Sequence, residues 1–171
     1  MSLDSAVDDV LICMEQEIRV SEAEVQVQRP LGDVVGHSAT VRQVLHNLIA
    51  NALKFVGPGQ PPWIRIRSEE SGGAIRVWVE DRGIGIAPQH QGKIFGLFQR
   101  LHSHDAYPGT GIGLAVVRKG LDRMGGSIGL ISESGAGSQF WFELPRAAVP
   151  QSAPSQAASP IAPASNAVVM V

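Results

Sequence analysis

Residues 38–56, SATVRQVLHNLIANALKFV, decide the fold because they predict one long helix with two distinct faces. Ser38 is the expected N-cap, and Gly57-Pro58 is the expected stop. Asn47, Asn51 and Lys54 follow at i, i+4 and i+7, within about 60° of one another. The apolar residues fill another broad face: Val41, Leu45, Leu48, Ile49, Ala52, Phe55 and Val56.

The polar stripe of this helix predicts a site rather than a solvated surface. Asn51 offers an amide oxygen, a hard ligand that suits Mg²⁺. Lys54 offers an ammonium group one turn away, which suits a phosphate. Because Mg²⁺ commonly keeps several waters and binds through substrate phosphates, a single protein oxygen is sufficient for it.

Two glycine-rich runs follow this helix, DRGIGI at 81–86 and GTGIGL at 109–114. Period two along the preceding strand places Ile75, Val77 and Val79 on one face, and Asp81 continues that apolar row. A buried carboxylate needs a donor, such as the amino group of adenine; the alternative is an ordinary turn aspartate before Gly83. GTGIGL opens a helix whose free N–H groups suit phosphates, although it has neither the dinucleotide-fingerprint nor the P-loop spacing.

The order of elements predicts an α+β fold, a two-layer sandwich with a mixed, mostly antiparallel sheet and helices on one face. We expect helices at 4–19 (capped by Asp4 or Ser5), 38–56 and 113–124, and a short strand pair within 23–36. Hairpins are expected at 63–69 with 74–80 and at 127–132 with 138–144. Residues 86–110 form a long connection with a short apolar helical turn, a length typical of a functional or mobile segment.

Composition excludes several classes of function. Of 171 residues 44% are hydrophobic, which indicates a folded chain, and a net charge of -2 gives no footprint for nucleic acid or an anionic membrane. The single cysteine, Cys13, allows no intrachain disulfide and is typical of a reducing compartment. With no apolar run near the roughly 18 residues that span a bilayer and no signal-peptide pattern, we expect a cytoplasmic protein.

Four segments in one order carry a resemblance to a known family. NLIANALKF, DRGIGI, IFGLFQRL and GTGIGLAVV resemble the asparagine, first-glycine, phenylalanine and second-glycine boxes of the ATP-binding domain of sensor histidine kinases. The closing GGSIGLISESGAGSQFWFELP resembles the terminal hairpin of that family. FQRLHSHDAYPGTGIGLAVV is most similar to PAS- or phytochrome-linked sensor kinases. The resemblance implies a Bergerat-type sandwich that binds Mg-ATP between its sheet and its helices, with a mobile ATP lid.

The resemblance also implies roles for residues at the phosphate end of the site. Asn51 matches the Mg²⁺ ligand, and Asn47 matches its neighbour along the phosphates. Lys54 matches the phosphate-contacting lysine, and Arg100 matches a lid arginine that reaches the terminal phosphate. Asn47, Lys54 and Arg100 are therefore the residues expected to act in catalysis.

At the other end of the site, Asp81 matches the adenine-recognising aspartate, and Ser138 keeps a hydroxyl where the family often has threonine. Phe95 and Phe98 are expected to anchor the lid to the core rather than to touch nucleotide. The full set expected to contact ATP is Asn47, Asn51, Lys54, Asp81, Gly83, Gly85, Ile86, Leu101, Gly109, Thr110, Gly111, Ile112, Gly113, Leu114 and Ser138.

One position distinguishes phosphoryl transfer from ATP hydrolysis. ATP hydrolases of the same fold, of the gyrase, chaperone and mismatch-repair type, carry a glutamate four residues before the Mg²⁺ asparagine. In this chain Asn47 occupies that position, and no carboxylate lies between Thr40 and Phe55. Because an amide cannot act as a general base, we expect transfer to a protein acceptor rather than to water, supported by charge neutralisation.

The acceptor of this family is a histidine on a separate two-helix dimerisation domain, usually followed by an acidic residue. Of the five histidines, His37, His46, His90, His102 and His104, only the last precedes an acidic residue, and it lies in the lid loop. We therefore expect a fragment of a larger kinase: residues 1–19 as a linker helix from the missing dimerisation domain, 20–146 as the catalytic domain and 147–171 as a disordered tail or linker rich in Pro, Ala and Ser.

The expected partners are the phosphoacceptor domain of the same kinase and, indirectly, a response regulator, with the isolated fragment monomeric. Two other functions are compatible with the same boxes. The first is a nucleotide-binding module without chemistry, and the second is a serine kinase of the anti-sigma-factor type. The intact asparagine and glycine boxes argue against the first, and the long lid with its phenylalanine box argues against the second.

Overall fold

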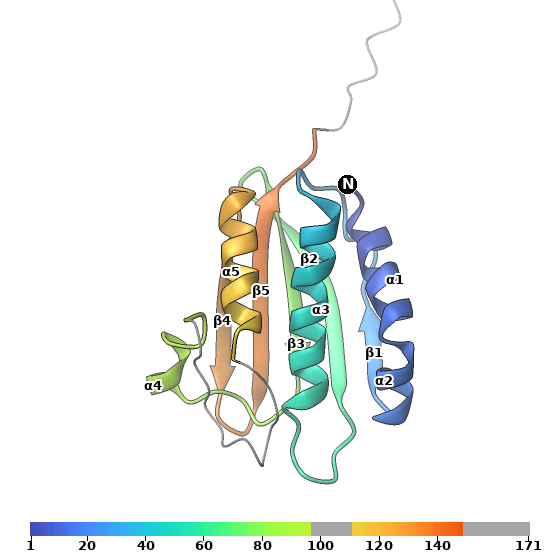
Figure 1. Ribbon diagram of the computed structural model, residues 1–171, viewed down its shortest axis with the longest axis vertical. Helices are drawn as coiled ribbons and strands as arrows, with labels where there is room; N and C mark the ends of the chain where they lie inside the picture. The colour runs from blue at the N-terminus through green and yellow to red at the C-terminus, as the bar shows by residue number, and fades with distance from the viewer. Residues whose placement is uncertain (97–110, 149–171) are drawn as a thin grey trace, which may run out of the picture.

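The computed structural model describes residues 1–96 and 111–148. The five strands of these residues form one sheet in the order β1-β2-β3-β5-β4, in which only β1 and β2 pair in parallel. The predicted α+β fold with a mixed, mostly antiparallel sheet is confirmed (Figure 1). The elements are α1 (Leu3–Cys13), α2 (Glu15–Val20), β1 (Glu24–Val27), α3 (Ser38–Lys54), β2 (Trp63–Ser71), β3 (Ala74–Asp81), α4 (Pro88–Gln91), α5 (Gly113–Arg123), β4 (Ser127–Glu133) and β5 (Gly137–Pro145).

The core lies between one face of the sheet and the helices α1, α3 and α5 (Figure 1). Alternate residues of the three central strands point into it, because side chains of a strand alternate between its faces. The predicted apolar stripe of α3 meets them, and Val44 joins it. The buried strand residues are Ile64, Ile66, Ile75, Val77, Val79, Phe140, Phe142 and Leu144.

The strand pair predicted within 23–36 is wrong. Only Glu24–Val27 forms a strand, and it pairs in parallel with the start of β2 instead of folding back on itself. The following residues leave the sheet, with Leu31 and Val34 buried in the core and Val34 making one isolated bridge to Arg146. A parallel pair requires a long crossover connection, and α3 supplies it here.

The first helix is shorter than predicted. The segment 4–19 divides at Met14 into α1 and α2, and α1 is capped by Ser2, whose Oγ accepts from the Ser5 N–H at 3.3 Å, rather than by Asp4 or Ser5. One face of α1 is buried in the common core through Leu3, Ala6, Val7 and Val10. Residues 1–13 therefore pack within the same folded unit as the sheet; their origin in a dimerisation domain stays a prediction.

Two predicted boundaries of α3 also differ. His37, rather than Ser38, is the N-cap, and it makes no side-chain capping bond. The helix ends at Lys54, two residues early, because Phe55 adopts a non-helical conformation and turns its carbonyl toward the loop after β3. Its polar stripe and most of its apolar stripe are nevertheless placed as predicted.

The second face of the sheet, which no described helix covers, carries a ladder of charged and aromatic side chains. We call this face the helix-free face. Glu80 is only 4% exposed there and accepts hydrogen bonds from Arg65 and from Arg67 Nε at 2.7 Å. Arginine side chains lie over the aromatic rings, as Arg67 does over Trp78 at 4.8 Å. Paired charges and stacked rings thus cover the sheet without a second layer.

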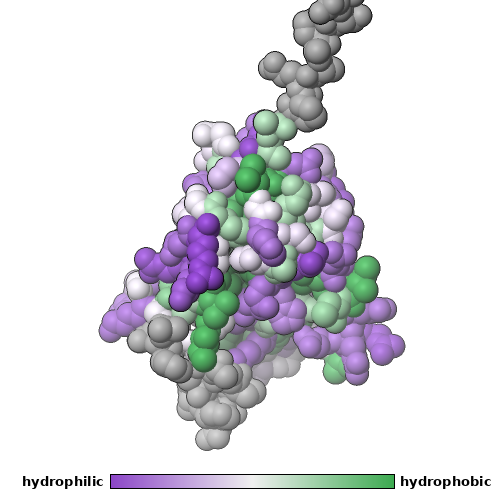
Figure 2. Space-filling view, turned by 45° about the horizontal axis from the view of Figure 1, so that its top comes forward, coloured by the Kyte–Doolittle hydropathy of each residue, from purple (hydrophilic) through white to green (hydrophobic). Residues whose placement is uncertain are grey.

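Hydrophilic side chains make up most of the surface seen in Figure 2, and hydrophobic ones gather in small separate groups. The large apolar side chains that are exposed belong to different elements: Ile12, Val20, Val35, Val116 and Ile131. Scattered apolar residues are normal on a protein surface. Within residues 1–96 and 111–148, no helix combines the length and the apolar character needed to cross a bilayer.

Candidate nucleotide site

The polar stripe of α3 meets the start of α5. Asn47 Nδ2 donates to the Gln43 carbonyl at 2.8 Å, which leaves Asn47 Oδ1 facing the second glycine run. A Cβ added to Gly113 would lie 2.7 Å from this oxygen, so a larger residue there would require the Asn47 side chain to shift. The structure therefore brings Asn47 and Gly113 together, as expected for residues that share one site.

The first glycine run packs against the other end of α3. The Ile84 N–H donates to the Phe55 carbonyl at 2.9 Å, and a Cβ on Gly83 would lie 2.0 Å from the same oxygen. Lys54 lies beside this junction, with Nζ 4.6 Å from the centre of the Phe55 ring. Thus α3 connects the two glycine runs, which lie at opposite ends of its polar stripe.

Asn51 is half-buried in the middle of that stripe. Its side-chain amide makes no hydrogen bond within the part of the chain that the structure describes, although its carbonyl accepts from the Phe55 N–H. The same residues contain no group of three or more His, Cys, Asp and Glu side chains able to hold a metal. A cation at Asn51 would complete its shell with water and phosphate, which is the habit of Mg²⁺, so the donor set fits that ion.

Asp81 ends β3 in an environment that disfavours its charge. Burial raises the pKa of its carboxyl group from 3.8 to about 6, and the N–H groups of Gly83 and Ser138 partly oppose this rise. Both bonds go to Oδ1, at 2.8 Å and 3.2 Å. Oδ2 accepts no hydrogen bond from the described residues, so this oxygen is available to a ligand that carries a donor.

The two base-side glycines, Gly83 and Gly85, have a role that the sequence did not indicate. Gly85 has a φ of +66°, and an added Cβ would lie 1.9 Å from the Glu133 carbonyl oxygen. The space at Gly83 is filled in the same way by Phe55. Both glycines thus permit close backbone packing inside the protein; their contact with a base stays a prediction.

Sequence reasoning missed Ser132 and Gln91, which join the start of the lid to the last hairpin. Ser132 Oγ accepts from the Ile86 N–H at 2.8 Å and lies 3.0 Å from Ser138 Oγ. Gln91 Nε2 donates to the carbonyls of Ile86 and Ser132 at 2.9 and 2.8 Å. In the sequence, the one clue to Ser132 is its position opposite Ser138 in the last hairpin, and this can be recognised only when the strand register is known.

The remaining predicted residues divide into two groups. Gly111 has a φ of +70°, Ile112 is half-buried before α5, and Leu114 and Phe95 pack against the core. The connection between the glycine runs holds the short helix α4, and the predicted helical turn KIFGLFQRL (93–101) lies partly outside the described residues. Five residues with predicted roles lie outside the described part of the chain: Phe98, Arg100, Leu101, Gly109 and Thr110. The histidines His102 and His104 lie there as well.

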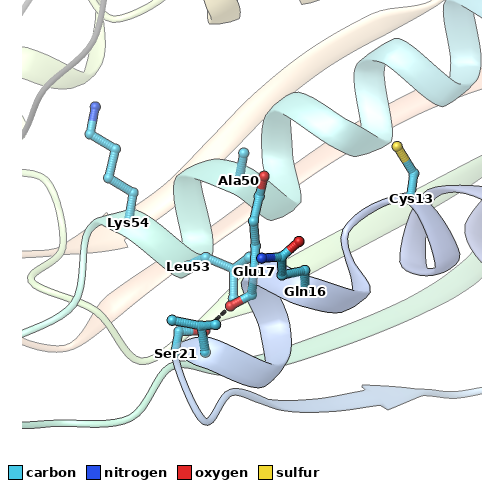
Figure 3. Close-up of a pocket in the computed structure, with 8 residues that line it drawn as sticks. Cys13, Gln16, Glu17, Ser21, Ala50, Leu53 and Lys54 are labelled. Atoms are coloured by element: carbon cyan, nitrogen blue, oxygen red, sulfur yellow. Dashed lines mark hydrogen bonds between the residues drawn. The ribbon is translucent and has the colours of Figure 1, made fainter.

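A separate hollow of about 660 Å³ lies between α2 and the C-terminal half of α3. In Figure 3 Lys54 extends from α3 on one side, well apart from Cys13 on α1. The other residues that line it are Gln16, Glu17, Val20, Ser21, Ala50 and Leu53. Lys54 is the one lining residue that also belongs to the candidate site; neither Asp81 nor a described residue of the glycine runs lines this hollow.

Comparison with known families identifies residues 36–148 as a match to the family described as histidine kinase-, DNA gyrase B- and HSP90-like ATPases. Phytochrome-like protein Cph1 of Synechocystis sp. is 42% identical over 139 residues, which cover 81% of this chain and 18% of the relative. The chain therefore spans less than a fifth of the length of this relative.

Solved structures show the same arrangement. Full-length ShkA in complex with AMPPNP matches with a TM-score of 0.73 at 30% identity, covering 88% of this chain and 32% of that one. The catalytic domain of the histidine kinase ThkA matches with a TM-score of 0.72 at 29% identity, covering 85% of this chain and 93% of that one. ThkA has also been solved in complex with the response regulator TrrA. These matches confirm the resemblance predicted from the sequence.

Proposed function

Because this chain belongs to the histidine kinase-, DNA gyrase B- and HSP90-like ATPase family, we propose that it is the catalytic ATP-binding domain of a sensor histidine kinase. In this function it binds Mg-ATP and transfers the γ-phosphoryl group to a histidine on a separate domain. The chain spans only part of its curated relatives, so the acceptor and the signal-sensing parts belong to the whole protein.

The position of Asn47 is the observation that carries this proposal. It lies against Gly113, and in sequence it occupies the position at which hydrolases of the same fold carry their glutamate. Its side chain is an amide, and α3 contains no acidic residue from Ser38 to Lys54. Because an amide cannot take a proton from water and α3 offers no carboxylate, attack by water is poorly supported, and attack by a nucleophile from another domain is favoured.

In the proposed reaction the bond between the γ-phosphorus and the β,γ-bridging oxygen breaks, and a bond to an imidazole nitrogen of the acceptor forms. ADP leaves with the bridging electrons. Asn51 would hold Mg²⁺, which neutralises phosphate charge when bound, and Lys54 and the α5 N-terminus would place positive charge beside the same phosphates. Arg100 in the lid is proposed for the terminal phosphate. Catalysis of this kind rests on positioning and electrostatics.

At the base end we propose that Asp81 Oδ2 accepts a hydrogen bond from the adenine amino group. The ionised form is the stronger acceptor, so recognition is expected to strengthen as the pH rises above the pKa of about 6. Gly83, Gly85 and Ile86 would border the base, and Ser138 would present its hydroxyl beside Asp81. The Ser138 N–H donates to Asp81 Oδ1 at 3.2 Å, and the two residues are opposite each other in the strand register, which supports this arrangement.

The partners follow from the reaction. We propose a dimerisation and phosphoacceptor domain as the direct partner and a response regulator as the indirect one, as in the ThkA complex with TrrA. The isolated chain is expected to be monomeric.

The decisive experiment mixes the full chain with γ-labelled ATP, Mg²⁺ and a separately made acceptor domain. Label on the acceptor that is labile in acid and stable in base supports histidine phosphorylation. Acid-stable label would support the serine-kinase alternative, free phosphate alone would support a hydrolase, and ATP binding without label would support a binding module. Asn51→Ala should remove the label, whereas Gln43→Ala, exposed on the same helix, is the matched control and should retain it.

A further inference from the structure

The Ser132 hydroxyl group takes part in three hydrogen bonds but has only one hydrogen. The direction of each bond can therefore be worked out. Its Oγ accepts from the Ile86 N–H at 2.8 Å, lies 2.8 Å from the Gly137 carbonyl oxygen and lies 3.0 Å from Ser138 Oγ. A serine hydroxyl has one hydrogen and two lone pairs. The contact with a carbonyl oxygen requires the hydrogen of Ser132, because a carbonyl can only accept.

The direction of the bond between the two serines follows from this count. One lone pair of Ser132 takes the Ile86 N–H, and its hydrogen goes to Gly137. The remaining lone pair can only receive the hydroxyl hydrogen of Ser138. Ser138 Oγ is thereby left with its lone pairs and no free hydrogen, so toward any further group it is an acceptor.

Ser138 and Asp81 are directly opposite each other in the register of β3 and β5, so their side chains lie on the same face of the sheet. The Ser138 N–H also donates to Asp81 Oδ1. Asp81 Oδ2 and Ser138 Oγ therefore form a pair of neighbouring acceptors. Such a pair matches an amino group, which carries two hydrogens, and opposes a carbonyl oxygen, which carries none.

We propose that Ser132 is a positioning residue that fixes the Ser138 hydroxyl group as an acceptor, and that it thereby makes the site select a base with an amino group over one with a carbonyl group. This inference rests on the proposed nucleotide function. Ser132 acts through Ser138 and does not touch the base. Removal of its hydroxyl would free the Ser138 hydrogen, which could then donate to a carbonyl oxygen.

Gln91 provides a matched control. It holds the same segment, because its Nε2 donates to the carbonyls of Ile86 and Ser132, but within the described residues it makes no hydrogen bond to either hydroxyl group. Its replacement should loosen the start of the lid without changing the direction of the Ser132–Ser138 bond. A general structural role and a directional role of Ser132 therefore predict different results.

The experiment measures the dissociation constants of ATP and ITP, which differ at the amino or carbonyl group of the base, by calorimetry with the full chain. Wild type should prefer ATP. Ser132→Ala should reduce the ratio of the ITP constant to the ATP constant about three- to tenfold, the loss expected for one directed hydrogen bond. Ser132→Thr, which keeps the hydroxyl, should restore the ratio, and Gln91→Ala should leave the ratio unchanged.

The outcomes separate this inference from the function on which it rests. Failure of wild type to bind ATP would overturn the proposed function and, with it, the inference. ATP preference that is equal in wild type and Ser132→Ala, or lost equally in Gln91→Ala, would overturn the role of Ser132 alone. If Ser132→Ala does not fold, Ser132→Cys tests the same point, because a thiol is a weak donor and acceptor, and an unchanged ratio in it would overturn the inference.

Discussion

Asp81→Asn is expected to stabilise the fold while it weakens the binding of nucleotide. The pKa of the Asp81 carboxyl group is raised from 3.8 to about 6 mainly by burial. At 1.36 kcal/mol per pKa unit, a rise of about two units means that ionised Asp81 costs the folded state about 3 kcal/mol. Asparagine keeps an oxygen for the N–H groups of Gly83 and Ser138 but carries no charge.

The sign of the pH dependence follows from proton binding. Between pH 3.8 and about pH 6 the folded protein retains a proton that the unfolded chain has released, so the Asp81 contribution to stability falls as pH rises through this window. Above about pH 6 the Asp81 contribution to stability no longer changes with pH. We therefore expect the free energy of unfolding of Asp81→Asn to exceed that of wild type by about 2–3 kcal/mol at pH 8 and by much less at pH 4.

Urea unfolding followed by circular dichroism at pH 4 and pH 8 measures this difference. Asp122→Asn, at an exposed position of α5, controls for the removal of a negative charge without relief of burial. An Asp81→Asn variant that is less stable than wild type at pH 8, or a difference that does not grow with pH, would refute the reasoning. Titration calorimetry of the same variant should show weaker ATP binding, since one ionic acceptor is lost.

Three further variants test separate features of the structure. Asn51→Ala should abolish the Mg²⁺-dependent part of ATP affinity, measured by calorimetry with and without the ion, and unchanged dependence would contradict the metal role. Gly85→Ala should destabilise the fold by more than about 2 kcal/mol in urea unfolding, because the new Cβ meets the Glu133 carbonyl at a positive φ, whereas Gly92→Ala, in open space, should not. Glu80→Ala should lower the free energy of unfolding by about 1–3 kcal/mol, because it leaves two arginines without their buried partner, and an effect below about 0.5 kcal/mol would show that the ladder is dispensable.

Long periodic elements could be predicted from the sequence. The stripe of α3 is strong over 17 residues, so its position and its polar side were predictable, and Asp81 lies where period two placed it. The parallel pairing of β1 with β2 could not be predicted. The partner strand begins 36 residues after β1 ends, and a four-residue strand carries little periodicity. The break at Met14 was also hidden, because the apolar spacing continues through it.

The candidate site residues stay predictions, and those that the sequence proposes have distinctive chemistry. Asn51 and Lys54 share one helix face, and Asp81 continues a buried row, where a carboxylate needs a donor. Ser132 and Gln91 have ordinary side chains whose importance depends on hydrogen-bond partners from other elements. Likewise, the glycines of DRGIGI suggested space for a ligand, whereas the structure fills that space with the backbone of Phe55 and Glu133.

The helix-free face gives the chain an optical property. All three of its tryptophans, Trp63, Trp78 and Trp141, belong to the ladder on that face, so intrinsic fluorescence reports on one surface of the sheet. Trp63 also lies under the guanidinium group of Arg82, 4.0 Å from its ring centre, and Arg82 directly follows Asp81. One of the three indoles is therefore linked through Arg82 to the end of β3 that carries Asp81, the residue proposed to bind the base.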